Sequence, residues 1–255
     1  MICKTEQEKE ILREGGKRLA EIRSVLAEKT KAGVSTVELD ELAYQLCTKD
    51  GDLPAFLNYT PFGAPRPFPS SICVSVNDVV VHGIPTEDPR VIKEGDLVTI
   101  DVGLVHKGLI TDSAITVEVG EVKDREHRMV VAAREALDKA IKKVRAGVRV
   151  GEISKVIEQT VKEQGFGVPQ ELGGHGVGKS IHEEPSITNV FFGNLGPSLR
   201  EGEVIAIEPI ITMGKGDIVF DHKDGYTITT KDGSKSAHSE HTLIVTKNGS
   251  EILTV

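Results

Sequence analysis

Hydrophobic residues recur every three or four positions in four stretches of the chain, which is the pattern of amphipathic helices. Thr5 with Glu8, and Ser35 with Glu38, have the spacing of capping boxes at the start of the first two stretches. Gly51 marks the end of the second, because glycine readily takes the left-handed conformation that ends many helices. The four predicted helices span residues 5–28, 35–51, 124–145 and 152–164.

Between and after these helices, short runs of β-branched and apolar residues predict strands. Residues 54–69 contain five prolines with four aromatic residues interleaved, so this segment predicts a loop. Its aromatic side chains either pack locally or form the wall of an apolar pocket. The strand-like runs span residues 72–76, 79–81, 96–117, 204–212, 217–220, 226–230 and 241–246.

Within residues 96–117, two of the acidic residues, Asp101 and Asp112, lie inside runs of β-branched and apolar residues. Lys107 and Gly108 between them have the character of a tight turn, so the run predicts a β-hairpin. A loop with an even residue count would place both carboxylates on one face, roughly 5–8 Å apart. Like charges that close repel each other, and unpaired carboxylates are rarely buried. Either one or both carboxylates reach solvent at a sheet edge, or a cation lies between them.

Part of the chain repeats. Residues 31–51 align without gaps on residues 145–165, so the second helical pair resembles a copy of the first. Two helices followed by strands, twice over, predict an α/β (α+β) fold with pseudo-twofold symmetry. The whole chain, residues 1–255, is then expected to form a single domain with two related halves of about 1–120 and 121–255.

A shorter alignment links the two halves through their acids. EGDLVTID, ending at Asp101, aligns on EGEVIAIE, ending at Glu208. A chance acid has no reason to recur at the equivalent place in the other half. The repeat therefore favours a cation held by carboxylates that converge from both halves.

Composition excludes several classes of function. The net charge is −8 without a long basic block, which argues against nucleic acid and anionic membranes as partners. Three cysteines form no CxxC pair, as is usual in a reducing cytosol. No apolar segment resembles a signal peptide, and no run reaches the length of a membrane span. We expect a soluble, cytoplasmic protein that binds neither nucleic acid nor membrane.

Residues 173–185 read GGHGVGKSIHEEP, and their first eight letters match the P-loop pattern GxxxxGK[ST]. A working P-loop needs a buried strand before it and a helix after it. Glycines and a proline precede this match, and Pro185 follows it closely, so we interpret the match as accidental. The segment instead places His175 and His182 where a glycine-rich backbone can approach a ligand.

Glu240, near the start of the last predicted strand, adds a fourth acid. Together with Asp101, Asp112 and Glu208 it gives four negative charges, which two divalent cations would neutralise. Carboxylates with a neutral imidazole are a common donor set for such ions. The remaining histidines of polar segments are expected to be exposed or structural: His106, His127, His222, His238 and His241.

These acids and histidines, with their flanking residues, resemble the dinuclear metallopeptidases of the "pita-bread" fold, and among them the type I methionine aminopeptidases. The matching stretches are VVVHGIP, GDLVTIDVG, GGHGVGKSIHEEP, IAIEPI and SAHSEHT, with Asp112 eleven residues after Asp101. The resemblance covers nearly the whole chain. It implies a curved, largely antiparallel sheet covered by two helical pairs.

The resemblance also implies a reaction. The family removes the initiator methionine from nascent proteins when the second residue is small, by means of metal-activated water. It implies two divalent ions (Mn, Fe, Co or Zn), a peptide or nascent-chain N-terminus as substrate, a monomeric state and a transient contact with the ribosome. Two alternatives stay open: a peptidase like aminopeptidase P or prolidase, and a non-catalytic binding protein of the same fold.

Residue roles follow from the same resemblance. Asp101 would chelate or bridge, Asp112 and Glu240 would bridge the two ions, and His175 and Glu208 would bind one ion. Glu208 would also move a proton, His182 would donate to the substrate carbonyl, and His82 would contact the substrate nearby. The residues expected to line the methionine pocket are Cys73, Phe62, Phe68 and Tyr226.

Two pocket positions depart from the aromatic residues expected of bacterial members. They are Pro65 and Ile181. A thioether gains roughly 0.3–1.5 kcal/mol from each sulfur–aromatic contact. The absence of aromatic residues at these two positions is therefore expected to loosen the preference for methionine without changing the reaction.

Overall fold

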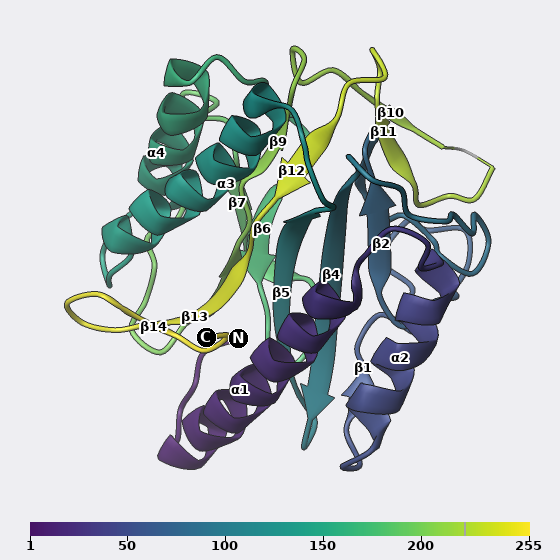
Figure 1. Cartoon of the computed structure of the whole chain (residues 1–255). Helices are drawn as coiled ribbons and strands as arrows, with labels where there is room; N and C mark the ends of the chain where they lie inside the picture. Colours follow the sequence, from purple (N-terminus) through teal and green to yellow (C-terminus); the bar gives the residue numbers. More distant parts are fainter. Residues whose placement is uncertain (222) are drawn as a thin grey trace.

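The structure is a computed structural model that describes residues 1–221 and 223–255, and it contains all four predicted helices (Figure 1). The prediction for His222 lies outside the described residues. Both predicted capping boxes form, since Glu8 accepts from the backbone of Thr5 and Glu38 from that of Ser35. The helices are α1 (Glu6–Lys29), α2 (Thr36–Thr48), α3 (Asp124–Lys143) and α4 (Val150–Glu163).

The strands pair antiparallel throughout the described residues. One sheet joins β1, β4 and β2 with β5 beside β4, and a second has the order β14-β13-β8-β6-β7. Two smaller sheets have the orders β10-β11-β3 and β12-β9. The strands are β1 (Leu53–Pro54), β2 (Cys73–Val76), β3 (Val79–Val81), β4 (Leu97–His106), β5 (Leu109–Glu118), β6 (Gly173–Gly176), β7 (Glu183–Thr188), β8 (Val204–Ile207), β9 (Ile210–Thr212), β10 (Ile218–Phe220), β11 (Ile228–Thr230), β12 (Ser236–His238), β13 (His241–Val245) and β14 (Ser250–Ile252).

Each helical pair covers one part of the curved sheet arrangement (Figure 1). The apolar side of α1 and α2 packs on β2 and β4 in one buried cluster that includes Leu19, Leu39 and Ile100. The apolar side of α3 and α4 packs on β8 and β13 in a second cluster that includes Met129, Ile157 and Leu243. The predicted fold class is confirmed. The division into two related halves near residue 120 stays a prediction.

The β4–β5 hairpin forms with the predicted turn. Lys107 and Gly108 both have positive φ, 47° and 80°, as a two-residue type I′ turn requires. Asp101 pairs with Ala114, and Gly103 pairs with Asp112. The two acids are therefore diagonal neighbours on the same face of the hairpin.

The predicted strand at residues 204–212 is two strands. β8 ends at Ile207 and β9 begins at Ile210, so the chain breaks at Glu208 and Pro209. Proline cannot donate to a strand ladder, which explains the interruption. The break leaves the Glu208 side chain at the end of a buried strand, where it is free to face a cavity.

Several short strands are absent from the predicted set, among them β6, β7, β12 and β14. β6 has the sequence Gly-Gly-His-Gly, which has little strand propensity. Glycine is needed there because a Cβ on Gly174 would lie 2.2 Å from the carbonyl oxygen of Ala206, and one on Gly176 would lie 2.2 Å from that of Glu184. Among the described residues, no helix combines the length and the apolar character that a membrane span requires.

Candidate metal centre

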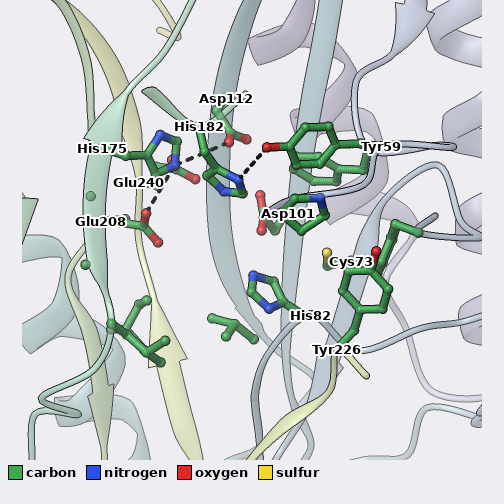
Figure 2. A pocket seen from close by; sticks show the side chains of 18 of the residues that line it. Tyr59, Cys73, His82, Asp101, Asp112, His175, His182, Glu208, Tyr226 and Glu240 are labelled. Carbon is green, nitrogen blue, oxygen red and sulfur yellow. Dashed lines mark hydrogen bonds and ion pairs between the residues drawn. The ribbon is translucent and has the colours of Figure 1, made fainter. Parts of the chain in front are cut away.

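A cavity of about 240 Å³ lies where strands from distant parts of the chain converge (Figure 2). Five predicted metal ligands line it, and each comes from a different element. Asp101 lies on β4, Asp112 on β5, His175 on β6, Glu208 directly after β8 and Glu240 between β12 and β13. The structure therefore brings all five together.

The acids of this cavity are buried without the partners that a carboxylate needs. One oxygen each of Asp101, Asp112 and Glu240 has no hydrogen-bond partner among the described residues. Burial raises the pKa of Asp101 to about 7. Burial, followed by the charges of neighbouring acids, raises the pKa of Asp112 and of Glu240 well above the ordinary range. Groups that are this costly to ionise indicate a site built around a positive charge.

Glu208 differs from the other three acids. Burial alone would raise its pKa, but contacts with His238 and His175 bring the pKa below its ordinary value. Its Oε1 lies 3.4 Å from Nε2 of His175, and its Oε2 lies 3.3 Å from Nε2 of His238. Asn189 donates to the Glu208 carbonyl and so holds its backbone.

The hydrogen bonding of His175 leaves one ring nitrogen available. Nδ1 lies 2.9 Å from the carbonyl oxygen of Gly176, which can only accept, so we assign the proton to Nδ1. The lone pair of Nε2 then faces Oε1 of Glu208 at 3.4 Å and Oδ2 of Asp112 at 4.0 Å. Three acceptors that face one another without a donor repel, and a metal ion between them removes that repulsion.

The donor set fits divalent metal ions. Ligating atoms of Asp112, His175 and Glu240 lie within 4.8 Å of one another. Asp101 and Glu208 line the same cavity and add further carboxylate oxygens. Oxygen-rich sites with one imidazole suit divalent ions such as manganese, iron, cobalt and zinc.

His182 stands at the mouth of the cavity, against His175. The two rings lie 4.6 Å apart at 80°, and the Tyr59 hydroxyl lies 3.3 Å from Nδ1 of His182 (Figure 2). Burial of its inner side, then the neighbouring histidines, lower the pKa of His182 to about 4. Its ring is therefore neutral at pH 7. If the hydroxyl donates to Nδ1, the remaining proton is on Nε2.

His82 lines the same cavity directly after β3. Its φ of 58° is unusual for a residue other than glycine. Such conformations cost roughly 1–3 kcal/mol and cluster at functional sites. Burial lowers the pKa of His82, so this ring is also neutral at pH 7.

The family model of metallopeptidase family M24 matches residues 10–247. The chain belongs to metallopeptidase family M24. This M24 chain is 43% identical to the methionine aminopeptidase of Aquifex aeolicus, over 98% of its own length and 97% of that protein. The crystal structure of methionine aminopeptidase from Thermotoga maritima superimposes on this chain with a TM-score of 0.92 at 40% identity. The match covers 100% of this chain and 99% of the Thermotoga maritima chain. The resemblance to methionine aminopeptidases is confirmed.

A more distant solved structure shares the fold. The Xaa-Pro dipeptidase of Bacillus anthracis superimposes with a TM-score of 0.78 at 23% identity. The M24 chain spans 62% of that protein. This likeness concerns the fold alone.

The predicted side-chain pocket of the M24 chain adjoins the predicted metal ligands. Cys73 pairs directly with Asp101 across β2 and β4 and lines the cavity. Phe68 and Tyr226 also line it, with ring centroids 5.1 Å apart in an edge-to-face arrangement. Ile181 is buried in the same apolar cluster. The effect of Ile181 on methionine preference stays a prediction.

Phe62 is the exception among the predicted pocket residues. Its side chain is fully exposed, and it does not line the cavity. Pro61 precedes it and Gly63 follows it in a turn, which directs the ring into solvent. Phe56 and Tyr59 supply the aromatic wall instead. They lie in the same proline-rich loop, residues 54–69. The aromatic residues of this loop are the feature of the sequence that indicates a pocket wall.

His238 is a buried neighbour of the predicted ligand Glu208. It was expected to be exposed or structural because polar residues surround it, yet its side chain is 2% exposed and faces Glu208. The available signal was its position in the sequence two residues before the predicted ligand Glu240. His106, by comparison, is buried in an ion pair with Asp52, and His127 is exposed beside Glu118.

The P-loop match in this M24 chain is accidental, as predicted. β7 follows the match where a P-loop requires a helix. Lys179 is exposed, and the backbone amides of Lys179 and Ser180 are bound by Oε1 of Glu183. No amide of that pair is therefore available to a phosphate.

The Lys179→Ala variant is expected to keep most of its peptidase activity, because exposed side chains outside a site usually contribute little. Calorimetry is expected to detect no ATP binding to the wild type or the variant. Lys162→Ala, which removes another exposed lysine, is the matched control. Magnesium-dependent ATP binding by the wild type that disappears only in Lys179→Ala would contradict this interpretation.

Proposed function

We propose that this M24 peptidase removes the N-terminal methionine from peptides and nascent proteins whose second residue is small. The observation that carries the proposal is the Nε2 lone pair of His175, which faces carboxylate oxygens of Asp112 and Glu208 without a donor between them. A metal ion between these atoms satisfies that arrangement for a neutral His175 ring and also compensates the burial of the neighbouring acids. The full-length similarity to the Aquifex aeolicus methionine aminopeptidase supports the substrate.

Five residues would hold two divalent ions. The four acids supply four negative charges, which balance two such ions and remove the cost of burying the acids alone. When bound, the ions would lower the pKa of a water and polarise the scissile carbonyl. The proposed ligands are Asp101, Asp112, His175, Glu208 and Glu240.

The remaining polar groups would act on the peptide. We assign the Nε2 proton of His182, held in place by Tyr59, as the donor to the substrate carbonyl oxygen. A neutral donor placed where negative charge develops favours the transition state over the ground state. His82 would contact the substrate from the other side of the cavity. Glu208 would carry the proton that the attacking water loses.

The apolar end of the cavity would hold the methionine side chain. Phe68 and Tyr226 line it with their rings edge to face, and Cys73 lines it beside Asp101. Sulfur–aromatic contacts are favourable by roughly 0.3–1.5 kcal/mol each, which distinguishes methionine from leucine.

The contribution of Asp101 to the stability of metal-free protein is expected to fall as the pH rises from about 4 to about 7. Asp101 has a pKa of about 7 in the folded protein, above its ordinary value near 3.9. Over that interval the folded protein keeps a proton that the unfolded chain releases. This stabilisation is complete below the unfolded pKa and is lost as the pH rises through the folded pKa.

The melting temperature of the chelator-treated wild type, measured relative to that of Asp101→Asn, reports this contribution. It should fall across the interval, and added manganese should raise it most at neutral pH, where protons no longer compete for the carboxylates. If manganese raised the melting temperature equally at pH 5 and pH 7.5, the acids would not be the ligands.

Release of methionine from Met-Ala-Ser tests the proposed function. The protein should release methionine with added manganese, iron, cobalt or zinc, and a chelator should stop the reaction. Met-Leu-Ser should react more slowly, and Ala-Pro-Ala should not react. No release with any of the four metals would refute the proposal, and faster hydrolysis of Ala-Pro-Ala would favour a prolidase-like activity.

We also propose that the substrates are nascent chains in the cytoplasm and that the protein acts as a monomer in transient contact with ribosomes. Sedimentation measures the oligomeric state. Co-pelleting with ribosomes at low and high salt measures the contact.

A further inference from the structure

The His238 ring is buried beside Glu208 in the candidate metal centre. Its side chain is 2% exposed, and Nε2 lies 3.3 Å from Oε2 of Glu208. Neither ring nitrogen of His238 meets hydrogen-bond geometry with any group within residues 1–221 and 223–255, Oε2 of Glu208 included. Glu208 is therefore the polar group toward which this ring is directed.

The backbone of His238 is fixed from two sides. Its N–H donates to Oγ1 of Thr116 at 2.8 Å, and the Thr116 hydroxyl donates to the His238 carbonyl at 2.9 Å. Thr99 lies 2.8 Å from the same Oγ1 and has the remaining hydrogen bond to it. On the other side, His238 pairs with Ile210, two residues after Glu208. The ring thus has little freedom to move away from the carboxylate.

The two oxygens of Glu208 have different neighbours. Oε1 faces the unprotonated Nε2 of His175, where we propose that a metal ion binds. Oε2 faces His238, and because a carboxylate only accepts, the interaction requires a proton on Nε2 of His238. Contacts in such sites are often long and tighten when the site is loaded.

We infer that His238 is a positioning residue of the metal centre, which holds Oε2 of Glu208 so that Oε1 is presented to the metal ion. This inference rests on the proposed function, because it assigns Glu208 as a metal ligand. Hydrogen bonds to a ligating carboxylate fix its orientation, and their loss typically costs 10–100-fold in metal affinity or activity. Without His238, the carboxylate would lose its fixed rotamer.

Two substitutions at His238 separate hydrogen bonding from packing. His238→Leu keeps an apolar side chain in the buried site but removes the donor. His238→Gln keeps an N–H donor at a similar distance from the backbone. His106→Gln is the matched control, because His106 is also buried against a carboxylate, Asp52, but lies outside the metal centre.

The first measurement is manganese affinity by equilibrium dialysis, which does not depend on turnover. His238→Leu should bind manganese about 10–100-fold more weakly than the wild type, whereas His238→Gln should remain within a few-fold of it. His106→Gln should bind manganese as the wild type does. Circular dichroism establishes that each variant is folded. If His238→Leu does not fold, His238→Asn replaces it, because its shorter side chain does not reach Glu208.

The second measurement is the hydrolysis of Met-Ala-Ser at saturating metal. His238→Leu should lower kcat more than it changes KM, since the methionine pocket is intact. Wild-type manganese affinity and kcat in His238→Leu would overturn the inference, as would equal losses in His238→Leu and His238→Gln. Failure of the wild type to release methionine refutes the proposed function instead, and is therefore distinguishable.

Discussion

The Asp101→Asn variant is expected to lose peptide hydrolysis by roughly 10³-fold or more, because metal polarisation contributes several kcal/mol to such reactions and about 1.4 kcal/mol corresponds to a factor of ten. Asparagine has nearly the size of aspartate but no charge. The substitution therefore lowers the charge of the four acids by one while it keeps the packing of β4 against β2. Metal content by elemental analysis should fall with the activity.

The same variant is expected to be at least as stable as the wild type when both are metal-free. One Asp101 oxygen is buried without a hydrogen-bond partner among the described residues, and burial raises the pKa of this carboxyl to about 7. A neutral amide costs less to bury there and does not repel the neighbouring acids. Stability retained with activity lost is the signature of a residue kept for function.

Asp40→Asn is the matched control for this prediction. Asp40 is also buried, but its Oδ1 accepts from the backbone amides of Ser71 and Ile72 at 2.7 and 3.1 Å. Its substitution should lower the melting temperature and leave the activity of the folded fraction unchanged. Wild-type metal stoichiometry with full activity in Asp101→Asn would refute the dinuclear assignment.

Most of the metal centre could be predicted because its parts lie on elements with strong local signals. The Lys107–Gly108 turn and the alternation of β4 and β5 determine that Asp101 and Asp112 share a face. The internal repeat then places Glu208 by analogy with Asp101. Both arguments use strand periodicity and turn chemistry, which act over a few residues and can therefore be read from the sequence.

The features that could not be predicted depend on contacts between distant segments. β6 is a strand because its glycines allow the backbone to approach Ala206 and Glu184 closely, and no local propensity indicates this. His238 has polar neighbours in sequence, yet β5 and β9 bury it from both sides. Phe62 lies between residues that pack, but the turn at Pro61 and Gly63 directs it into solvent.

The His182→Ala variant is expected to lower kcat by roughly 10²–10³-fold, the usual cost of removing one preorganised donor. Its metal content should be unchanged. His182 and His175 lie with their rings 4.6 Å apart, so proximity alone does not separate a donor from a ligand. Their hydrogen bonds do. Nδ1 of His175 bonds to the Gly176 carbonyl, which leaves a lone pair on Nε2 of the neutral ring, whereas Nδ1 of His182 meets the Tyr59 hydroxyl, and if that hydroxyl donates, the proton of His182 is on Nε2.

Two measurements therefore distinguish the histidines. Elemental analysis of His182→Ala should give the wild-type metal content, and its KM for Met-Ala-Ser should change less than kcat, because the donor acts mainly as charge develops on the carbonyl oxygen. His127→Ala, which removes an exposed histidine on α3, is the control and should change neither value. If His182→Ala lost a metal ion while His175→Ala kept its metal content, His182 would be the ligand and His175 the donor. The proton on Nε2 of His182 would then have been assigned to the wrong nitrogen, and the Tyr59 hydroxyl would be the acceptor of that hydrogen bond.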